Sequence, residues 1–128
     1  MNKKDIDQIF AVDGTTSDDG SEVIINQKLS RTIRKFDSQN LKKIKVHSVL
    51  GEVWIHLEKL QASEGVITIE LDSMMGRLNI YLPHTWQVDN QLHATLTNVN
   101  LIGKSTAAET KLVLKGKSSL GTIQVYFI

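Results

Sequence analysis

The chain has 128 residues, of which 41% are hydrophobic and 23% are charged. This length fits one domain with a single core, and the composition is too apolar for wholesale disorder. The formal net charge of +1 provides no global attraction for nucleic acid or anionic membrane, and the lack of cysteine excludes disulfides, thiolate metal sites and cysteine nucleophiles.

The N-terminal part of the chain is acidic. Residues 1–27 hold six acidic side chains against two lysines. The segment from Asp13 to Gly20 is polar and lacks periodicity, which predicts a loop or disordered lead-in. We expect a partly disordered acidic lead-in over residues 1–22 and one folded domain over residues 23–128. No apolar stretch has the length of a membrane span or of a signal-peptide core, so we expect no membrane span in this chain.

A basic stretch follows the acidic lead-in. Residues 28–45 hold seven basic side chains against Asp37 alone. Such clusters contact phosphates, lipid headgroups or acidic proteins, but Phe36 is the one aromatic among them, so we expect no nucleic acid partner. The alternative is a solvated edge that attracts the acidic N-terminus of the same chain. The candidate basic patch consists of Lys28, Arg31, Arg34, Lys35, Lys42 and Lys43.

From residue 41 onward, apolar and polar residues alternate with period two, which predicts strands. Within this region residues 46–57 align without gaps to residues 71–82, an offset of 25 from Gly51 to Gly76. A third copy surrounds Gly121, and a partial copy ends at Gly103. We interpret these four residues as structural turn glycines, because a sharp coil corner often needs positive φ. Pro83 ends the strand of the second copy.

A repeat of this period predicts an all-β parallel β-solenoid, in which equivalent positions of successive coils stack about 4.8 Å apart. The offset also brings three charged pairs of opposite sign together, which favours the solenoid over the alternative, an antiparallel sandwich. The charged pairs are Lys45 with Glu70, His47 with Asp72, and Glu52 with Arg77. The expected core pairs are Val46 with Leu71, Val49 with Met74, Leu50 with Met75, Val53 with Leu78, Ile55 with Ile80, and Leu57 with Leu82.

No constellation in the sequence predicts an enzyme. The histidines have neither cysteine partners nor helical spacing, so we expect no metal and no cofactor. Ser48 or Ser73 could be combined on paper with His47 and Asp72 into a catalytic triad. Alternation, however, places adjacent residues on opposite faces, and the nucleophile-elbow and phosphate-loop motifs are missing. We therefore expect no catalytic residue.

An outward strip of aromatic residues is the other candidate surface. Counting alternately from the inward strand positions places Trp54, His56, Tyr81 and Tyr126 together, with His56 stacked on the two tyrosines. Exposed aromatics of this kind suit a protein-contact surface, and equally they suit a row that stabilises a solenoid face. The chain ends inside a strand at Ile128, which predicts an unpaired edge and self-association.

The motifs together resemble the C-terminal domain of the LiaF-type cell wall-active antibiotic response proteins of Gram-positive bacteria. The resemblance implies a right-handed parallel β-solenoid of about four to five short coils. The segments that carry it are residues 49–57 (VLGEVWIHL), 67–83 (ITIELDSMMGRLNIYLP), 86–88 (WQV), 101–103 (LIG) and 120–125 (LGTIQV).

The resemblance also implies a function. Such domains are non-catalytic regulators of a two-component system that answers cell-envelope stress, and a sensor histidine kinase is the implied partner. Typical members carry N-terminal membrane helices, which this sequence lacks, so we expect a cytoplasmic protein, or one at the cytoplasmic face of the membrane if an anchor was removed. The alternative is a self-assembling structural module whose coil edges pair between copies, giving a homo-oligomer.

Overall fold

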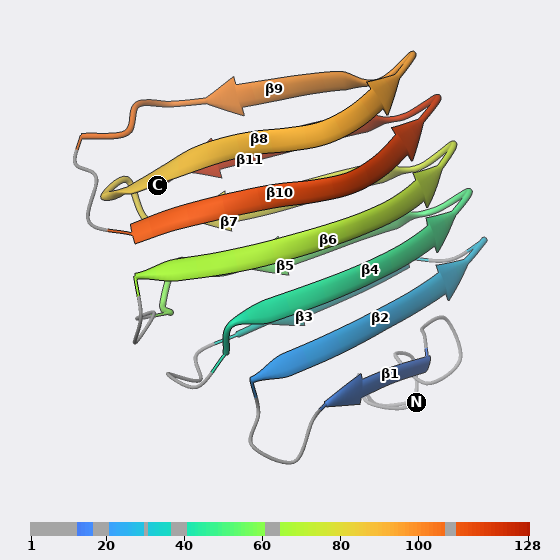
Figure 1. The fold of residues 1–128 in the computed structure, drawn as a ribbon, viewed down its shortest axis with the longest axis horizontal. Coiled ribbons are helices and arrows are strands. Elements are labelled where there is room, and N and C mark those ends of the chain that lie inside the picture. Colours follow the sequence, from blue (N-terminus) through green and yellow to red (C-terminus); the bar gives the residue numbers. More distant parts are fainter. Residues whose placement is uncertain (1–12, 17–20, 30, 37–40, 61–64, 107–109) are drawn as a thin grey trace.

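The computed structural model in Figure 1 describes residues 13–16, 21–29, 31–36, 41–60, 65–106 and 110–128, which form strands and connections without a helix. The strands build two sheets that face each other. Sheet A contains, in spatial order, β1 (Asp13–Thr16), β2 (Glu22–Lys28), β4 (Lys43–Val49), β6 (Val66–Met74), β10 (Thr110–Ser119) and β8 (Trp86–Thr95). Sheet B contains β3 (Arg31–Lys35), β5 (Glu52–His56), β7 (Arg77–Leu82), β11 (Thr122–Phe127) and β9 (Asn98–Ile102).

The arrangement is a parallel β-solenoid, as the repeat predicts. Each coil gives one strand to sheet A and the next strand to sheet B, and all pairings described are parallel except that of β1 with β2. Trp54 lies opposite Asn79, and Ser48 lies opposite Ser73, so the predicted offset of 25 is the register of the coils.

The core fills the space between the sheets. Alternation turns every second side chain inward, and parallel stacking places aliphatic side chains over one another in rows. One row runs through Ile44, Ile69 and Leu114, and another through Ile55, Ile80 and Val125, all of them fully buried. Each such side chain contributes roughly 1.5–3 kcal/mol by leaving water, so these rows hold the coils in register.

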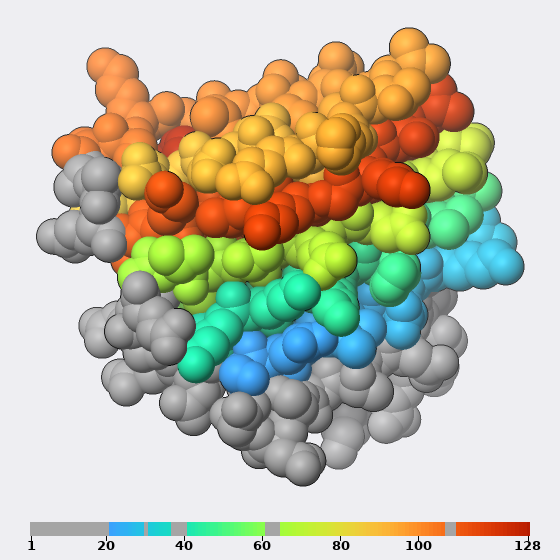
Figure 2. Space-filling view, viewed as in Figure 1, coloured from blue at the N-terminus to red at the C-terminus, as the bar shows by residue number. Residues whose placement is uncertain are grey.

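The coils do not stack in the order of the sequence. The coil of β10 and β11 lies between the coil of β6 and β7 and the coil of β8 and β9 (Figure 1), and Figure 2 shows residues 110–119 sandwiched between residues 66–74 and 86–95. The prediction that the C-terminal strand forms an open edge is therefore wrong.

Asn90 of β8 takes the inward place beside Leu114, and its side chain is exposed. At an end of the stack this amide reaches water, whereas in the middle it would be buried.

The corners between sheet A and sheet B also differ from the expectation. Leu50 and Met75 were expected in the core, as were Val49 and Met74, but these side chains are 38% to 52% exposed. The strands end here, so Val49 and Met74 fall on outward positions, and the residue after each lies on the bend itself. Their apolar character alone does not distinguish a corner from a core position.

Gly76 and Gly121 act through space rather than through φ, whereas Gly103 has the predicted positive φ, +96°. The positive φ angles at the corners, 51° and 56°, belong to Leu50 and Met75, the residues that precede Gly51 and Gly76. A Cβ on Gly76 would lie 2.9 Å from the Gly51 carbonyl oxygen, and one on Gly121 would lie 2.6 Å from that of Gly76. These glycines are needed because successive corners approach closely.

Gly103 is not a glycine of these corners. It follows β9 at the opposite end of sheet B, where a Cβ would lie 2.9 Å from the Phe127 carbonyl oxygen. The place beside Gly121 belongs to Thr97, since the amide of the next residue, Asn98, donates a hydrogen bond to the Gly121 oxygen. The Thr97 hydroxyl donates a hydrogen bond to the Ser118 carbonyl oxygen at 3.0 Å. At this corner a threonine side chain therefore takes the position that glycine has in the neighbouring corners.

Most of the lead-in predicted over residues 1–22 lies outside the described residues. The described part differs from the loop expected over residues 13–20, because Asp13–Thr16 form β1, antiparallel to β2. Without β1, the backbone groups of β2 would have no strand partner along one side. The two threonines in β1 also favour an extended chain. Pairing with the edge strand β2 thus makes this polar segment a strand rather than the predicted loop.

Candidate functional site

The outer face of sheet B carries the predicted row of aromatic rings. His56, Tyr81 and Tyr126 occupy equivalent positions on β5, β7 and β11. The His56 and Tyr81 rings are stacked with centroids 4.5 Å apart and planes 3° apart, and Tyr81 and Tyr126 are stacked at 4.8 Å and 11°. The coil spacing of about 4.8 Å suits face-to-face contact of equivalent rings. The predicted stack is confirmed, and all three side chains are half-buried.

Trp54 lies two residues before His56 on the same face, but it joins a different row. Its strand neighbours are Ile33 and Asn79, and the Arg31 guanidinium lies 5.1 Å from the ring centroid. This distance allows a cation–π contact. An arginine, an indole and an exposed isoleucine thus lie beside the stacked rings on one surface, with Ile33 49% exposed. We call this surface the aromatic face: Arg31, Ile33, Trp54, His56, Tyr81 and Tyr126.

A carboxylate borders the aromatic face. His56 Nδ1 lies 2.9 Å from Glu58 Oε1, and the two residues line a shallow hollow with Lys35, Phe36 and Lys59. Glu58 Oε2 is buried and has no hydrogen-bond partner among the described residues.

Sheet A carries the predicted charge pairs on its outer face. Lys45 and His47 lie beside Glu70 and Asp72 in the register, as expected. The side chain closest to Glu70 is not that of its register neighbour Lys45 but that of Lys43, whose Nζ is 2.7 Å from Glu70 Oε2. His47 contacts its own register neighbour, with Nδ1 3.5 Å from Asp72 Oδ2. The hydrogen bond from Lys43 lowers the pKa of Glu70 and raises that of the lysine. All of these groups are well exposed, so their pairing sets register more than stability.

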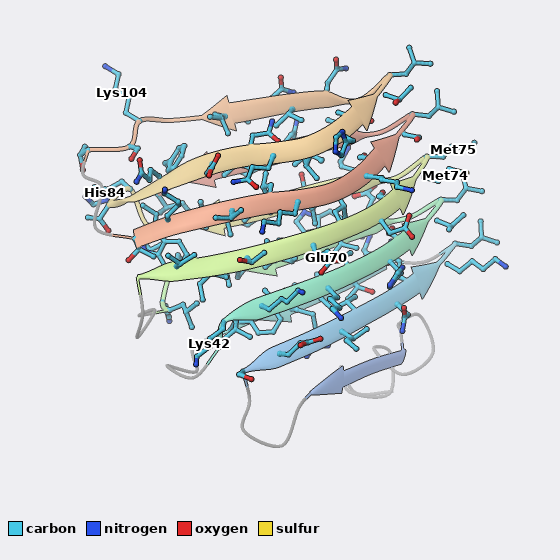
Figure 3. All side chains as sticks on the ribbon, viewed as in Figure 1. Lys42, Glu70, Met74, Met75, His84 and Lys104 are labelled. Atoms are coloured by element: carbon cyan, nitrogen blue, oxygen red, sulfur yellow. The ribbon has the colours of Figure 1, made fainter. Side chains whose placement is uncertain are left out.

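The basic stretch does not form one patch. Arg31 and Lys35 lie on the outer face of sheet B, whereas Lys43 lies on sheet A, paired with Glu70. Lys28 ends β2, and Lys42 lies at the opposite edge of sheet A, where Figure 3 labels it.

Arg34 occupies an inward position beside Ile55, with its guanidinium 5.4 Å from the centroid of the Phe36 ring. The expected single basic surface is therefore wrong. Strand alternation and the corner send neighbouring charges in different directions.

Of the residues considered for catalysis, His47 and Asp72 lie together, but Ser48 does not join them. Ser48 is buried and its hydroxyl accepts a hydrogen bond from Gln27 Nε2 at 2.9 Å, whereas His47 points out of sheet A. In the part of the chain that the structure describes, no group of three histidine or acidic side chains is placed to hold a metal ion. Within the same residues, no helix has the length and apolarity needed to cross a bilayer.

The structure adds a surface that the sequence reasoning missed. Five aliphatic residues follow one another at the corner from sheet A to sheet B, each with φ between 49° and 56° and a side chain 44% to 78% exposed. The sequence signal is an aliphatic residue directly before a corner glycine at Leu50, Met75 and Leu120, two of which, Leu50 and Met75, are expected in the core from the repeat. In stacking order this corner ridge consists of Leu29, Leu50, Met75, Leu120 and Leu96.

Tyr81 is the middle ring of the stack, and its removal has a predictable cost. We expect Tyr81→Ala to lower the free energy of unfolding by about 2 kcal/mol, because it removes two stacked pairs and half-buried ring surface. Tyr126→Ala removes one pair and should cost about half as much. Urea denaturation followed by tryptophan fluorescence measures both variants, and equal losses would contradict an energetic role for the stack.

The matched family model is the one described as cell wall-active antibiotics response LiaF, C-terminal, and it covers residues 20–125. The comparison with curated proteins and that with solved structures each gave no match. The family match begins just before β2 and ends in β11, so it covers all five coils of the solenoid. The chain therefore belongs to the LiaF-like C-terminal family of cell wall-active antibiotics response proteins.

Proposed function

We propose that this solenoid is a non-catalytic regulatory domain of the cell-envelope stress response, and that it acts by binding a sensor histidine kinase of a two-component system. The observation that carries the proposal is the family match over residues 20–125, whose description is a response to cell wall-active antibiotics. We place the domain in the cytoplasm or at the cytoplasmic face of the membrane.

The aromatic face is the surface that we assign to the kinase. Protein-binding hot spots are enriched in tryptophan, tyrosine and arginine, and this face combines Trp54, Tyr81, Tyr126 and Arg31. The rings are pre-ordered by stacking, so little side-chain entropy is lost on binding. The Glu58 carboxylate, 2.9 Å from His56 Nδ1, adds a negative charge at the border of this face.

The absence of a catalytic role is also part of the proposal. The inward Ser48 and the outward His47 cannot share a proton, and the pair of His47 and Asp72 lies on an open strand face. Such a face does not exclude water from a reacting group.

The experiment measures binding of the chain to the sensor kinase of the same organism by biolayer interferometry. The variant Arg31→Glu/Lys35→Glu reverses two charges on the outer face of sheet B. The matched control, Lys111→Glu/Lys115→Glu, makes the same change in β10 of sheet A. We expect at least a tenfold loss of kinase affinity for the first variant and no change for the control. Equal affinities of all three proteins, or no binding by the wild-type chain, would disprove the assignment.

A self-assembling structural module is the second candidate, and the edge of β8 favours it. This ten-residue strand has a strand partner on one side only among the described strands. One backbone amide of the strand, that of Leu92, is already bonded to Asn90 Oδ1 at 3.1 Å, which weakens the edge as a template. Light scattering distinguishes the regulatory domain from the self-assembling module. The module would be supported if the wild-type chain forms oligomers and Gln91→Pro in β8 disperses them without changing kinase binding.

A further inference from the structure

The corner ridge concentrates exposed aliphatic surface along one edge of the solenoid. Twelve large hydrophobic side chains are exposed in the described residues, and seven of them are the five ridge residues with Val49 and Met74 beside them. Figure 2 shows the corners projecting one above another along this edge, and Figure 3 labels Met74 and Met75 there. We propose that the corner ridge docks the domain edge-on onto an anionic lipid bilayer. This proposal does not depend on the kinase assignment.

The backbone conformation of the ridge indicates that its aliphatic side chains have a function other than packing in the core. A positive φ strains residues that carry a Cβ, and glycine or asparagine would adopt it at lower cost. Leucine or methionine nevertheless stands at all five positions, although the core gains almost nothing from side chains that are exposed. A strained and exposed aliphatic residue is unfavourable in the free domain, so its persistence points to a ligand that covers it.

The backbone of the ridge is suited to contact with lipid. A peptide group that enters a bilayer needs an internal hydrogen-bond partner. The amides of four ridge residues donate to carbonyl oxygens of the neighbouring coil at 2.9–3.0 Å, which also fixes their stacking order. The bonds run from Leu29 to Val49, from Leu50 to Met74, from Met75 to Ser119, and from Leu120 to Thr95.

The shape of the ridge favours a bilayer over a protein partner. Its five members follow the coil spacing of about 4.8 Å and form a row roughly 19 Å long. A protein would need a groove of matching length, and protein hot spots favour aromatic residues over leucine. The deformable boundary between headgroups and acyl chains accepts a row of aliphatic side chains without a preformed groove.

Charges around the ridge select the type of lipid. Four exposed cationic side chains and two acidic side chains lie within three residues of a ridge member in the sequence. The neighbourhood of the ridge is therefore positive, although the whole chain is nearly neutral. Lysine and arginine at this level attract anionic headgroups while the aliphatic side chains enter the bilayer. The cations are Lys28, Arg31, Arg77 and Lys117, and the acids are Glu52 and Asp72.

Vesicle flotation of the full chain tests the proposal. The vesicles contain either phosphatidylcholine alone or 30 mol% phosphatidylglycerol, and we expect the wild-type chain to float with the anionic ones. Leu50→Asn/Met75→Asn/Leu120→Asn should lower the partition coefficient at least tenfold. Asparagine accepts positive φ, so this variant keeps its fold. The matched control, Val66→Asn/Ile102→Asn/Ile128→Asn, removes three exposed aliphatic residues elsewhere and should float like the wild type.

A second measurement reports the depth of the ridge directly. The chain contains no cysteine, so Met75→Cys and Val66→Cys each accept one environment-sensitive dye. The dye at position 75 should shift to the blue on anionic vesicles, and the dye at position 66 should not shift. Absence of flotation by the folded wild-type chain, or equal flotation of the ridge variant, overturns the proposal. A dimer that the ridge variant abolishes without any lipid binding would assign the ridge to a second copy and also overturn it. Kinase binding should be the same for the ridge variant and the wild type.

Discussion

Replacing Gly116 by alanine should lower the free energy of unfolding by about 3 kcal/mol or more. Gly116 lies within β10, beside Leu71 of β6, and has a φ of +104°. A Cβ at this position would overlap the Leu71 carbonyl oxygen, which belongs to the backbone and cannot rotate away. The cost combines the strain of positive φ with a separation of β10 from β6.

Urea denaturation measures this loss, and the two lysines that flank Gly116 provide matched controls. Lys115→Ala and Lys117→Ala make exposed changes in the same strand and should each change the free energy of unfolding by less than about 0.5 kcal/mol. Gly76→Ala should fall between these limits, because the oxygen of Gly51 would be 2.9 Å from the new Cβ. A loss below about 1 kcal/mol for Gly116→Ala would show that β10 and β6 do not approach as described.

Much of the solenoid follows from one sequence signal. The ungapped repeat between residues 46–57 and 71–82 predicts the register of β4 with β6 and of β5 with β7, in which Trp54 lies opposite Asn79. The same alternation that turns Val53 inward turns His56 outward, so the stack with Tyr81 was predictable. Register is recoverable here because a slip of one residue would expose a whole row of core side chains.

The remaining features depend on three-dimensional proximity that the repeat does not encode. Gly116 interrupts an ordinary strand pattern, and only the approach of Leu71 explains it. Leu50 has the same hydrophobicity as a core residue, and its exposure depends on the corner geometry. Asn90 hints that β8 belongs at an end of the stack, but it does not tell which coil intervenes.

An engineered disulfide between positions 72 and 117 should form readily and raise the free energy of unfolding by about 3–4 kcal/mol. Asp72 and Lys117 are exposed neighbours on β6 and β10, and neighbouring strands lie about 4.8 Å apart, within the range that a disulfide spans. The cross-link closes a loop of about 45 residues, which restricts the unfolded chain. The absence of natural cysteines makes each engineered pair unambiguous.

Two further pairs establish the order of the coils. Lys117→Cys/His93→Cys joins β10 to its other neighbour, β8, and should also cross-link. Asp72→Cys/His93→Cys spans two strand spacings, about 10 Å, and should remain reduced under the same mild oxidation. Coils stacked in sequence order would place β8 between β6 and β10, so the 72–93 pair would cross-link and the 72–117 pair would remain reduced, whereas the 93–117 pair would form in either order. The fraction of cross-linked chain, measured by electrophoresis without reductant, therefore distinguishes the interposed order from the sequential one, and cross-linking of the 72–93 pair in place of the 72–117 pair would refute the interposed coil.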